Sequence, residues 1–385
     1  MRDDTSKKTK YINRQIDMSL LVTVIFLIAF GLIMIYSTSS YEAAMKYGDA
    51  AYFLKKQLLS TVIGVIAMAF FAMVDYRKWS GLAVPGYIVT IICIILVMSP
   101  LGIEANGARR WIGVGGLSFQ PAELAKVAVI LFFATFLSKR PNIVNKFSTS
   151  FVMLIYAGII AGMIMVITSN MSSAIIVAGI AYIMMMIVSK KSKWYILVAV
   201  LIFAGMALLL VSMGGFRLNR IKVWLHPEAY SKDGGFQTLQ ALYALGSGGL
   251  FGKGLGQSVQ KLGFVPEAQN DMVFSIICEE LGIFGGVALI ILFAFLIWRL
   301  MAIANNADDL FGTLLAIGVM IHIALQVVLN IAVVTNTIPN TGITLPFISY
   351  GGTSSLFLMI EMGLALSVSR GSKKAKRRLV TNDEA

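Results

Sequence analysis

Residues 264–275 read FVPEAQNDMVFS, and this stretch joins a polar loop to a long apolar segment. Its polar side chains stand together immediately before the apolar run: Glu267, Gln269, Asn270 and Asp271. The run that follows is long enough to cross a membrane as a helix. The stretch therefore predicts a carboxylate at the mouth of a membrane span, where it would either cap the helix or take a proton from a substrate.

The composition is that of a membrane protein. Of the 385 residues, 58% are hydrophobic and only 13% are charged, which excludes an ordinary soluble globular domain. Cys93 and Cys278 both lie in apolar runs and are expected to be free core thiols. His226 and His322 are too few and too scattered to predict a histidine metal site.

Apolar runs of about 20 residues predict ten membrane-spanning helices. The runs start near Met18, Leu58, Leu82, Pro121, Phe151, Met171, Trp194, Met272, Leu310 and Thr353. We therefore expect an all-α polytopic membrane fold in a single domain over residues 1–385. Its other parts are an N-terminal tail (1–17), a large loop between spans seven and eight (214–270), a broken segment (338–355) and a basic tail (370–385).

The distribution of Lys and Arg predicts the orientation. If the N-terminus is cytoplasmic, cytoplasmic segments hold most of the 32 basic residues, so both termini are expected inside. The net charge of +13 then reflects topology and contact with anionic lipid rather than binding of nucleic acid. The chain is accordingly expected to be an integral, multi-pass membrane protein.

A minority of the cations fall on the opposite side or within a span. Arg109 and Arg110 fall in a short outer loop, Lys126 lies in the fourth span, and Arg220 and Lys261 lie in the large outer loop. Because such charges oppose the insertion bias, they suggest that positive charge is needed there. A long loop crosses the membrane regardless of its charge. The arginines of the short loop, Arg109 and Arg110, are therefore the residues that favour an anionic ligand.

Two polar regions interrupt the apolar pattern. The loop 214–270 contains the glycine cluster GSGGLFGKGLG (246–256) and enough apolar residues to predict short helices against the bilayer surface. Gln237 and Gln240, at i and i+3, would share one helix face. The segment 338–355 carries two prolines and three glycines among apolar residues, which predicts non-helical backbone lining a cleft.

Ionisable residues inside the predicted spans form a third group. Glu123 and Lys126 lie at i and i+3 and could pair with each other. For Glu279 and Glu280 we favour structural ion pairs between helices, whereas for Lys126 we favour a function. Glu361 has no evident partner in the sequence.

Three motifs, in this order, resemble those of the SEDS (shape, elongation, division, sporulation) glycosyltransferases. They are NGARRWIGVGGLSFQPAELAK (106–126), the run from GGFQTLQ to CEELG (234–282) and NTGITLPFISYGGTSS (340–355). The resemblance covers essentially all ten spans and implies the SEDS fold. YFLKKQ (52–57) and Thr344 are similar to the cell-division branch, FtsW, and the sporulation branch, SpoVE, shares them. RodA relatives usually carry proline in place of Thr344.

The chain departs from the family pattern at two places. QNDM (269–272) stands where His-Thr-Asp-Phe is usual, which keeps the acid and changes its neighbours. TSNMSS (168–173) stands where Pro-Asp-Leu-Gly is common, so Asn170 replaces an acid there. The second change argues against a charged site at that turn.

The resemblance implies a peptidoglycan glycosyltransferase that polymerises lipid II, an undecaprenyl-pyrophosphate-linked disaccharide-pentapeptide, at the outer face of a bacterial cytoplasmic membrane. It implies that Asp271 is the general base of an inverting transfer that yields β-linked glycan. The candidates for substrate binding are Arg109, Arg110, Glu123, Lys126, Arg220, Gln237, Lys261, Glu267, Ser349 and Ser354. Of these, the pyrophosphate contacts are expected from Arg109, Arg110, Lys126 and Arg220. Whether a divalent cation (Mg²⁺ or Mn²⁺) joins the pyrophosphate is left open.

Relatives of this kind work with a class B penicillin-binding transpeptidase and other division proteins at the septum, so these partners are expected here. Two other functions stay open: a transporter that flips lipid II, and a scaffold that recruits division proteins. The polar motifs cluster at one membrane face, and the two halves show no repeat, which argues against the transporter. An inactive scaffold would not need Asp271 beside an arginine-lined loop.

Overall fold

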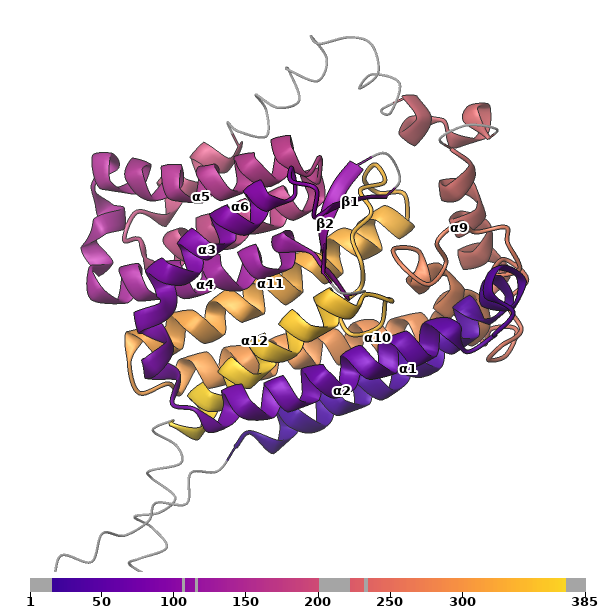
Figure 1. The fold of residues 1–385 in the computed structure, drawn as a ribbon, viewed down its shortest axis with the longest axis horizontal. Coiled ribbons are helices and arrows are strands. Elements are labelled where there is room, and N and C mark those ends of the chain that lie inside the picture. Colours follow the sequence, from indigo (N-terminus) through magenta and orange to yellow (C-terminus); the bar gives the residue numbers. More distant parts are fainter. Residues whose placement is uncertain (1–15, 106–107, 115–116, 201–221, 232–234, 372–385) are drawn as a thin grey trace, which may run out of the picture.

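The computed structural model of the chain describes residues 16–105, 108–114, 117–200, 222–231 and 235–371. Over these residues the protein is mainly helical, and nine helices are long and apolar enough to cross a membrane (Figure 1). They are α1 (Met18–Tyr47), α2 (Tyr52–Met73), α3 (Ala83–Leu96, which continues the 3₁₀ helix η1, Tyr76–Leu82), α4 (Pro121–Lys139), α5 (Phe147–Ile167), α6 (Met171–Val188), α10 (Val273–Asn305), α11 (Leu310–Val334) and α12 (Gly352–Arg370).

The predicted membrane helices are confirmed in type and order over the described residues. Predicted and observed starts coincide at Met18, Pro121, Met171 and Leu310 and differ by a few residues elsewhere. The predicted seventh span, from Trp194, falls mostly on residues outside the described ranges. The count of ten spans therefore stays a prediction.

A small antiparallel sheet between α3 and α4 departs from the all-α expectation. It consists of β1 (Gly102–Ala105), β2 (Ala108–Val114) and β3 (Leu117–Phe119), in that order. The strands are short and flanked by glycines, so the sequence lacks the long alternation that predicts a strand. Arg109 and Arg110 therefore lie on a strand rather than in irregular structure.

Among its described residues, the large loop contains the short helices η3 (Pro227–Tyr230) and α9 (Phe236–Ser247). Their predicted position against the bilayer surface stays a prediction. The glycine cluster 246–256 packs its backbone directly against α10. A Cβ at Gly248 would stand 2.0 Å from the carbonyl oxygen of Cys278, and one at Gly252 would stand 2.2 Å from that of Glu280. Only glycine permits this approach, so close packing against α10 accounts for these glycines.

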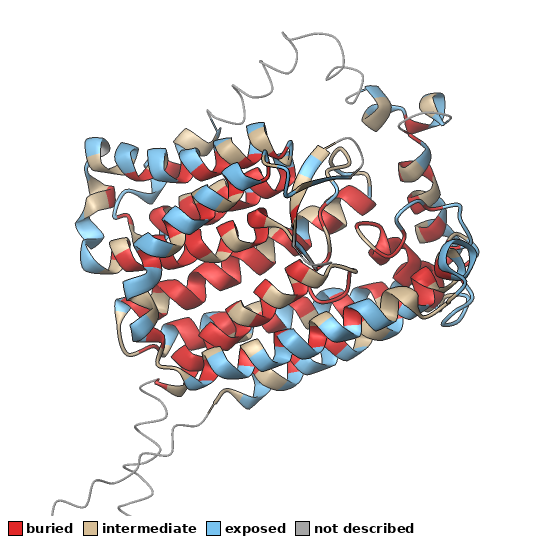
Figure 2. Cartoon of the chain, in the orientation of Figure 1, coloured by how far each residue is buried: buried red, intermediate tan, exposed pale blue. Residues whose placement is uncertain are grey.

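The helices α4, α11 and α12 form the interior of the bundle. In the most apolar stretch of 18 residues of each of these helices, 78%, 67% and 78% of the residues are buried. The same share is 22% for the helix that includes α3. α12 packs along α2 and α11, and α4 packs against α3, α6 and α11. Figure 2 shows buried residues in the centre of the bundle and exposed ones on the outward faces of the outer helices. Those exposed faces are apolar, as contact with lipid requires.

The segment between α11 and α12 contains no helix between Ile338 and Tyr350, as its prolines and glycines predicted. Four of its apolar residues are no more than 5% exposed: Ile343, Leu345, Phe347 and Ile348. Gly31 in α1 permits the segment to enter, because a Cβ there would stand 2.2 Å from the carbonyl oxygen of Phe347. The non-helical backbone is thus enclosed by protein, the condition for such backbone at membrane depth.

One end of the bundle collects basic side chains. Arg77 in η1 pairs with Asp309 at the start of α11 at 2.8 Å, and Arg299 near the end of α10 pairs with Asp17 before α1. Further basic residues at this end are Lys78, Lys139, Arg140, Lys190, Lys191, Lys193 and Arg370. Asp271 precedes α10 and therefore lies at the opposite end. This separation agrees with an orientation in which the basic end is cytoplasmic.

We predict that the end with Asp271 faces outward. In a background without Cys93 and Cys278, a membrane-impermeant maleimide should label Gln257→Cys in intact cells and Ser192→Cys only after permeabilisation. Both positions are exposed, and they lie at opposite ends of the bundle. Labelling of Ser192→Cys in intact cells, without labelling of Gln257→Cys, would contradict the orientation.

Candidate active site

Asp271 lies in the turn that leads into α10, and its side chain is 8% exposed. Its carboxylate oxygen Oδ1 accepts a hydrogen bond from Nε2 of Gln237 on α9 at 3.4 Å. Its backbone carbonyl accepts a hydrogen bond from Nδ2 of Asn330 on α11 at 2.8 Å. Two other elements of the fold therefore hold this residue in place.

The alternative role for Asp271, that of a helix cap, finds no support in the geometry. The N-cap residue of α10 is Met272, and no side-chain capping bond is made there. By contrast, Asp17, Asn170 and Asp309 accept backbone N–H bonds at the starts of α1, α6 and α11. The carboxylate of Asp271 therefore makes no capping bond to the first turn of α10.

Burial changes the acidity of Asp271. Removal from water raises the pKa of its carboxyl to about 7. The negative charge of Glu267 adds to the rise, while the backbone N–H groups of Asp271 and Met272 oppose it. A carboxyl with this pKa can accept a proton near neutral pH more readily than an ordinary aspartate.

Gln237 connects Asp271 to the segment 338–355. Its Oε1 accepts a hydrogen bond from Nδ2 of Asn340 at 3.0 Å, and Oδ1 of Asn340 accepts one from the backbone N–H of Gly342 at 3.0 Å. Gly342 has a φ of 69°, and a Cβ there would lie 4.0 Å from Oδ2 of Asp271. The segment predicted to line a cleft therefore passes directly beside the carboxylate.

Polar side chains spaced by four residues lie on one face of α11: His322, Gln326 and Asn330. Nδ2 of Asn330 donates to the carbonyl oxygens of Asp271 and Ile343, at 2.8 and 2.7 Å. Nε2 of Gln326 donates to the carbonyl oxygen of Thr344 at 3.0 Å. Sequence reasoning missed Gln326 and Asn330, although polar residues at this spacing in an apolar span are a usable signal.

Glu123 and Lys126 form the predicted pair on α4. Nζ of Lys126 lies 2.9 Å from Oε1 of Glu123, and both residues are buried. Nζ also donates to Oε1 of Gln326 at 3.4 Å. The second carboxylate oxygen of Glu123 has no hydrogen-bond partner among the described residues. The pair therefore connects α4 to the polar face of α11 and leaves one buried acceptor free.

Glu361, for which the sequence suggested no partner, pairs with a histidine of another helix. Its Oε2 lies 2.7 Å from Nδ1 of His322, and Nε2 of His322 lies 2.8 Å from Oε1 of Gln326. The two partners lie on α11 and α12, far apart in the sequence. Only the packing of the two helices reveals the pair.

Glu279 and Glu280 form ion pairs, as favoured from the sequence, but their partners are lysines of the large loop rather than residues of another helix. Glu279 pairs with Lys253 at 2.6 Å and Glu280 with Lys261 at 2.8 Å, and both carboxylates are fully buried. Lys261 also donates to the hydroxyl of Ser37 at 3.0 Å. Lys261, a candidate for substrate binding, is thus engaged with Glu280, and the two pairs hold the loop against α10.

The two arginines of β2 have different surroundings. Arg109 is exposed, and its Nε lies 3.5 Å from a carboxylate oxygen of Glu104 on β1. Arg110 donates to the carbonyl oxygens of Thr168 and Ser169, at 3.3 and 3.1 Å. Arg110 thus joins the sheet to the turn between α5 and α6, where the family acid is absent.

Glu267 and Ser349 both contact Asn270, the residue before Asp271. Glu267 adopts a φ of 55° and accepts a hydrogen bond from the side-chain amide of Asn270. Oγ of Ser349 donates to the carbonyl oxygen of Asn270 at 2.5 Å and accepts from the backbone N–H of Leu345 at 2.8 Å. Both side chains thus shape the turn that carries Asp271.

The remaining candidates are Ser354 and Arg220. Ser354 lies partly buried in the first turn of α12, whereas Arg220 lies outside the described residues. Among the described residues, no three His, Cys, Asp or Glu side chains gather into a metal site.

The chain is similar to known proteins over most of its length. The family model described as "Cell cycle protein", which covers FtsW, RodA and SpoVE, matches residues 18–374. Stage V sporulation protein E of Bacillus subtilis is 40% identical over 373 residues, which are 96% of this chain and 100% of the relative. A probable peptidoglycan glycosyltransferase FtsW of Trichlorobacter lovleyi is 37% identical over 360 residues, 93% of this chain and 94% of the relative.

Solved structures show the same fold. A chain of a peptidoglycan synthase complex, described as coordinating polymerization and crosslinking, matches with a TM-score of 0.76 at 25% identity, covering 92% of this chain and 98% of that one. The rod shape determining protein RodA of Thermus thermophilus matches with a TM-score of 0.69 at 26% identity, covering 93% and 98%. The chain therefore belongs to the FtsW/RodA/SpoVE family of cell cycle proteins and has the SEDS fold.

Proposed function

We propose that the protein is a peptidoglycan glycosyltransferase that polymerises lipid II into β-linked glycan strands at the outer face of the cytoplasmic membrane. The observation that carries the proposal is the buried carboxyl of Asp271, which makes no capping bond to α10 and lies beside Gly342. The relatives named probable peptidoglycan glycosyltransferase FtsW support the reaction.

The reaction joins a sugar hydroxyl of one substrate to the anomeric carbon of another. Asp271 takes the hydroxyl proton as the new carbon–oxygen bond forms, and the bond from the anomeric carbon to undecaprenyl pyrophosphate breaks. The raised pKa of Asp271 makes its carboxylate a stronger base than an ordinary aspartate. Attack from the side opposite the leaving group inverts the anomeric carbon, so an α-linked donor gives a β-linked product.

In the proposed reaction, the cations stabilise the leaving group. A pyrophosphate departs as a stable anion, so it needs positive charge more than it needs a proton. Arg109 and Arg110 of β2 and Lys126 of α4 are the proposed contacts, because arginine binds phosphate oxygens in a bidentate way. If a divalent cation takes part, it arrives with the pyrophosphate and adds to this charge.

The proposed partner is a class B penicillin-binding transpeptidase, together with other division proteins at the septum. A structural relative that is part of a peptidoglycan synthase complex supports such a partner. Relatives named FtsW support a role in division, and the relative named Stage V sporulation protein E supports the alternative role in sporulation.

A lipid II transporter and a division scaffold are the alternatives. Neither needs a general base, since neither breaks nor forms a covalent bond. Variants of Asp271 that keep the fold therefore separate the enzyme from both alternatives.

Asp271→Asn should lower glycan polymerisation by about a hundred- to ten-thousand-fold, the usual contribution of a general base. The amide matches the carboxylate in size and still accepts a hydrogen bond from Gln237, so folding should be preserved. Purified protein would be incubated with labelled lipid II, with and without the cognate transpeptidase, and the product measured by gel electrophoresis.

The matched control is Glu228→Gln, which removes an exposed carboxylate from the same loop and should leave polymerisation unchanged. Near-normal product from Asp271→Asn, with Asp271→Ala impaired only through lower thermal stability, would show that the carboxylate has a structural role.

The rate should also rise with pH through about 7. Asp271 has a raised pKa, so it is protonated and inactive as a base below that value and ionised above it. The same shift means that stability falls as the pH rises through about 7, because the ionised carboxyl is buried. Melting curves from pH 5 to 8 should therefore show a loss of stability that Asp271→Asn lacks. Identical pH dependence in both proteins would contradict the assignment.

Lys126→Met should lower kcat/KM for lipid II by about ten- to a hundredfold, the range expected for a lost charge-assisted hydrogen bond. Removing one partner of a buried pair also destabilises the fold, because it leaves Glu123 as an unpaired charge. The double variant Glu123→Gln/Lys126→Met removes both charges and should restore the melting temperature without restoring activity. Recovery of activity in the double variant would mean that the pair is only structural.

A further inference from the structure

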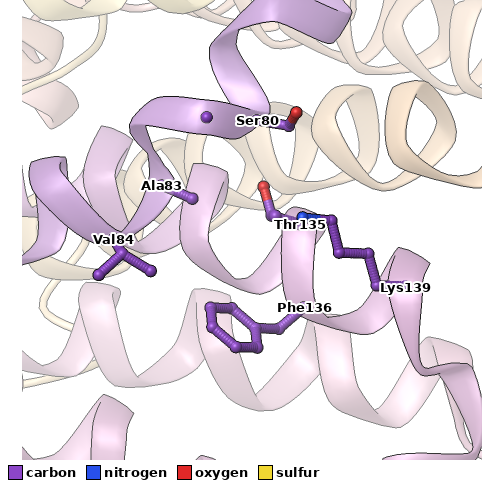
Figure 3. A pocket seen from close by; sticks show the side chains of 7 residues that line it. Ser80, Ala83, Val84, Thr135, Phe136 and Lys139 are labelled. Atoms are coloured by element: carbon purple, nitrogen blue, oxygen red, sulfur yellow. The ribbon is translucent and has the colours of Figure 1, made fainter.

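A small cavity opens at the basic end of the bundle, away from the candidate active site. Its volume is about 200 Å³, and it lies where the end of α4 meets η1 and the start of α3. Figure 3 shows its walls, with Ser80 and Val84 on one side and Thr135, Phe136 and Lys139 of α4 on the other. The proposed reaction uses none of these side chains.

Thr135 is an unusual buried threonine. It is 4% exposed, yet its hydroxyl has no hydrogen-bond partner among the described residues. Other buried threonines of the helices donate to the carbonyl oxygen four residues earlier: Thr23, Thr38 and Thr90. Figure 3 shows the hydroxyl oxygen of Thr135 directed toward η1, across the cavity. A buried donor without an acceptor costs free energy, which an acceptor atom of a ligand would recover.

Lys139 provides a cation at the same place. It lies in the last turn of α4, and Figure 3 shows its ammonium nitrogen turned back toward Thr135. The hydroxyl of Ser80 already donates to the carbonyl oxygen of Arg77 at 2.8 Å. Among the described residues Thr135 has no hydrogen-bond partner, and Lys139 lines the same cavity as an exposed cation. The two donors together suit an anionic oxygen.

The rim of the cavity is apolar and open to lipid. Val84 and Phe136 line the cavity, and Val84 is 45% exposed. Leu82, the residue before α3, is 50% exposed. Nearby, Trp79 stacks on Phe71 with ring centroids 4.4 Å apart, and tryptophan is typical of the membrane–water boundary. A ligand of this cavity would thus meet a cation, a hydroxyl and an apolar flank at headgroup depth.

We propose that the cavity binds the phosphate of an anionic phospholipid headgroup. Thr135 and Lys139 donate to the phosphate oxygens, and the acyl chains lie against Val84 and Leu82. The volume of about 200 Å³ holds roughly six or seven water-sized groups, which suits a phosphate with its glycerol and excludes a whole lipid. Basic pockets between membrane helices are known to recognise anionic headgroups, and the surrounding basic residues would attract them.

The test is a lipid titration of the full-length, delipidated protein in neutral detergent, with bound lipid counted by native mass spectrometry. Phosphatidylglycerol should bind more tightly than zwitterionic phosphatidylcholine. Lys139→Gln should weaken the binding of phosphatidylglycerol about fivefold, and Thr135→Val should weaken it about tenfold. Thr135→Val replaces a hydroxyl without a partner by a methyl group, so it should not lower the melting temperature of the lipid-free protein.

The matched control is Lys191→Gln, which removes an exposed lysine from the same end of the bundle but outside the cavity. Equal affinities of Lys139→Gln and Lys191→Gln, or unchanged binding by Thr135→Val, would overturn the site. Glycerol 1-phosphate is a soluble molecule with the same phosphate group, so it tests whether the cavity binds a soluble phosphate instead of a lipid. If it binds as tightly as phosphatidylglycerol, the assignment to a membrane lipid is wrong.

Discussion

The side-chain amide of Asn330 holds together the two parts of the chain on which the candidate site depends. One nitrogen donates to the carbonyl oxygens of Asp271, before α10, and of Ile343, in the segment between α11 and α12. Neither carbonyl belongs to a regular helix, and backbone carbonyls without partners are costly inside an apolar bundle. Non-helical backbone can stay beside Asp271 only because polar side chains of α11 satisfy it.

The cost of unpaired polar groups inside the apolar bundle also separates two kinds of buried carboxylate. Glu279, Glu280 and Glu123 are buried with lysine partners, and Glu361 is buried with His322. Such pairs reduce the cost of charge in an apolar interior and fix how the helices pack. Asp271 is buried against an amide and backbone instead, and its pKa rises for that reason. Among the described residues no cation pairs with Asp271, and a buried carboxyl of this kind can exchange a proton with a substrate.

The departures from the family motifs have local physical reasons. Gln269 donates to a carboxylate oxygen of Glu42 at 3.1 Å, so it ties the turn before α10 to the end of α1. Asn170 caps α6 by accepting a hydrogen bond from the backbone N–H of Ser173 at 3.0 Å. An asparagine can do this as well as an aspartate, so loss of the acid keeps the helix start and removes the charge. Arg110 then binds backbone carbonyls of the turn instead of a carboxylate.

The sequence by itself determined the features that depend on neighbours along the chain. Long apolar runs predicted the membrane helices, prolines and glycines predicted the broken segment 338–355, and the spacing of Glu123 and Lys126 predicted their pair. These are local properties, because a helix satisfies its own backbone and presents residues i and i+3 on one face. The motifs also identified the family, because a motif is recognised from the order of residues along the chain.

Only the tertiary structure decided which side chains meet across helices. His322 and Glu361, or Asn330 and Asp271, come from helices and turns whose packing no local pattern encodes. The sheet that carries Arg110 was missed because its strands are short and their pairing is set by the hairpin. The cavity beside Thr135 also appears only once η1 and the start of α3 lie against α4, because its walls come from all three elements.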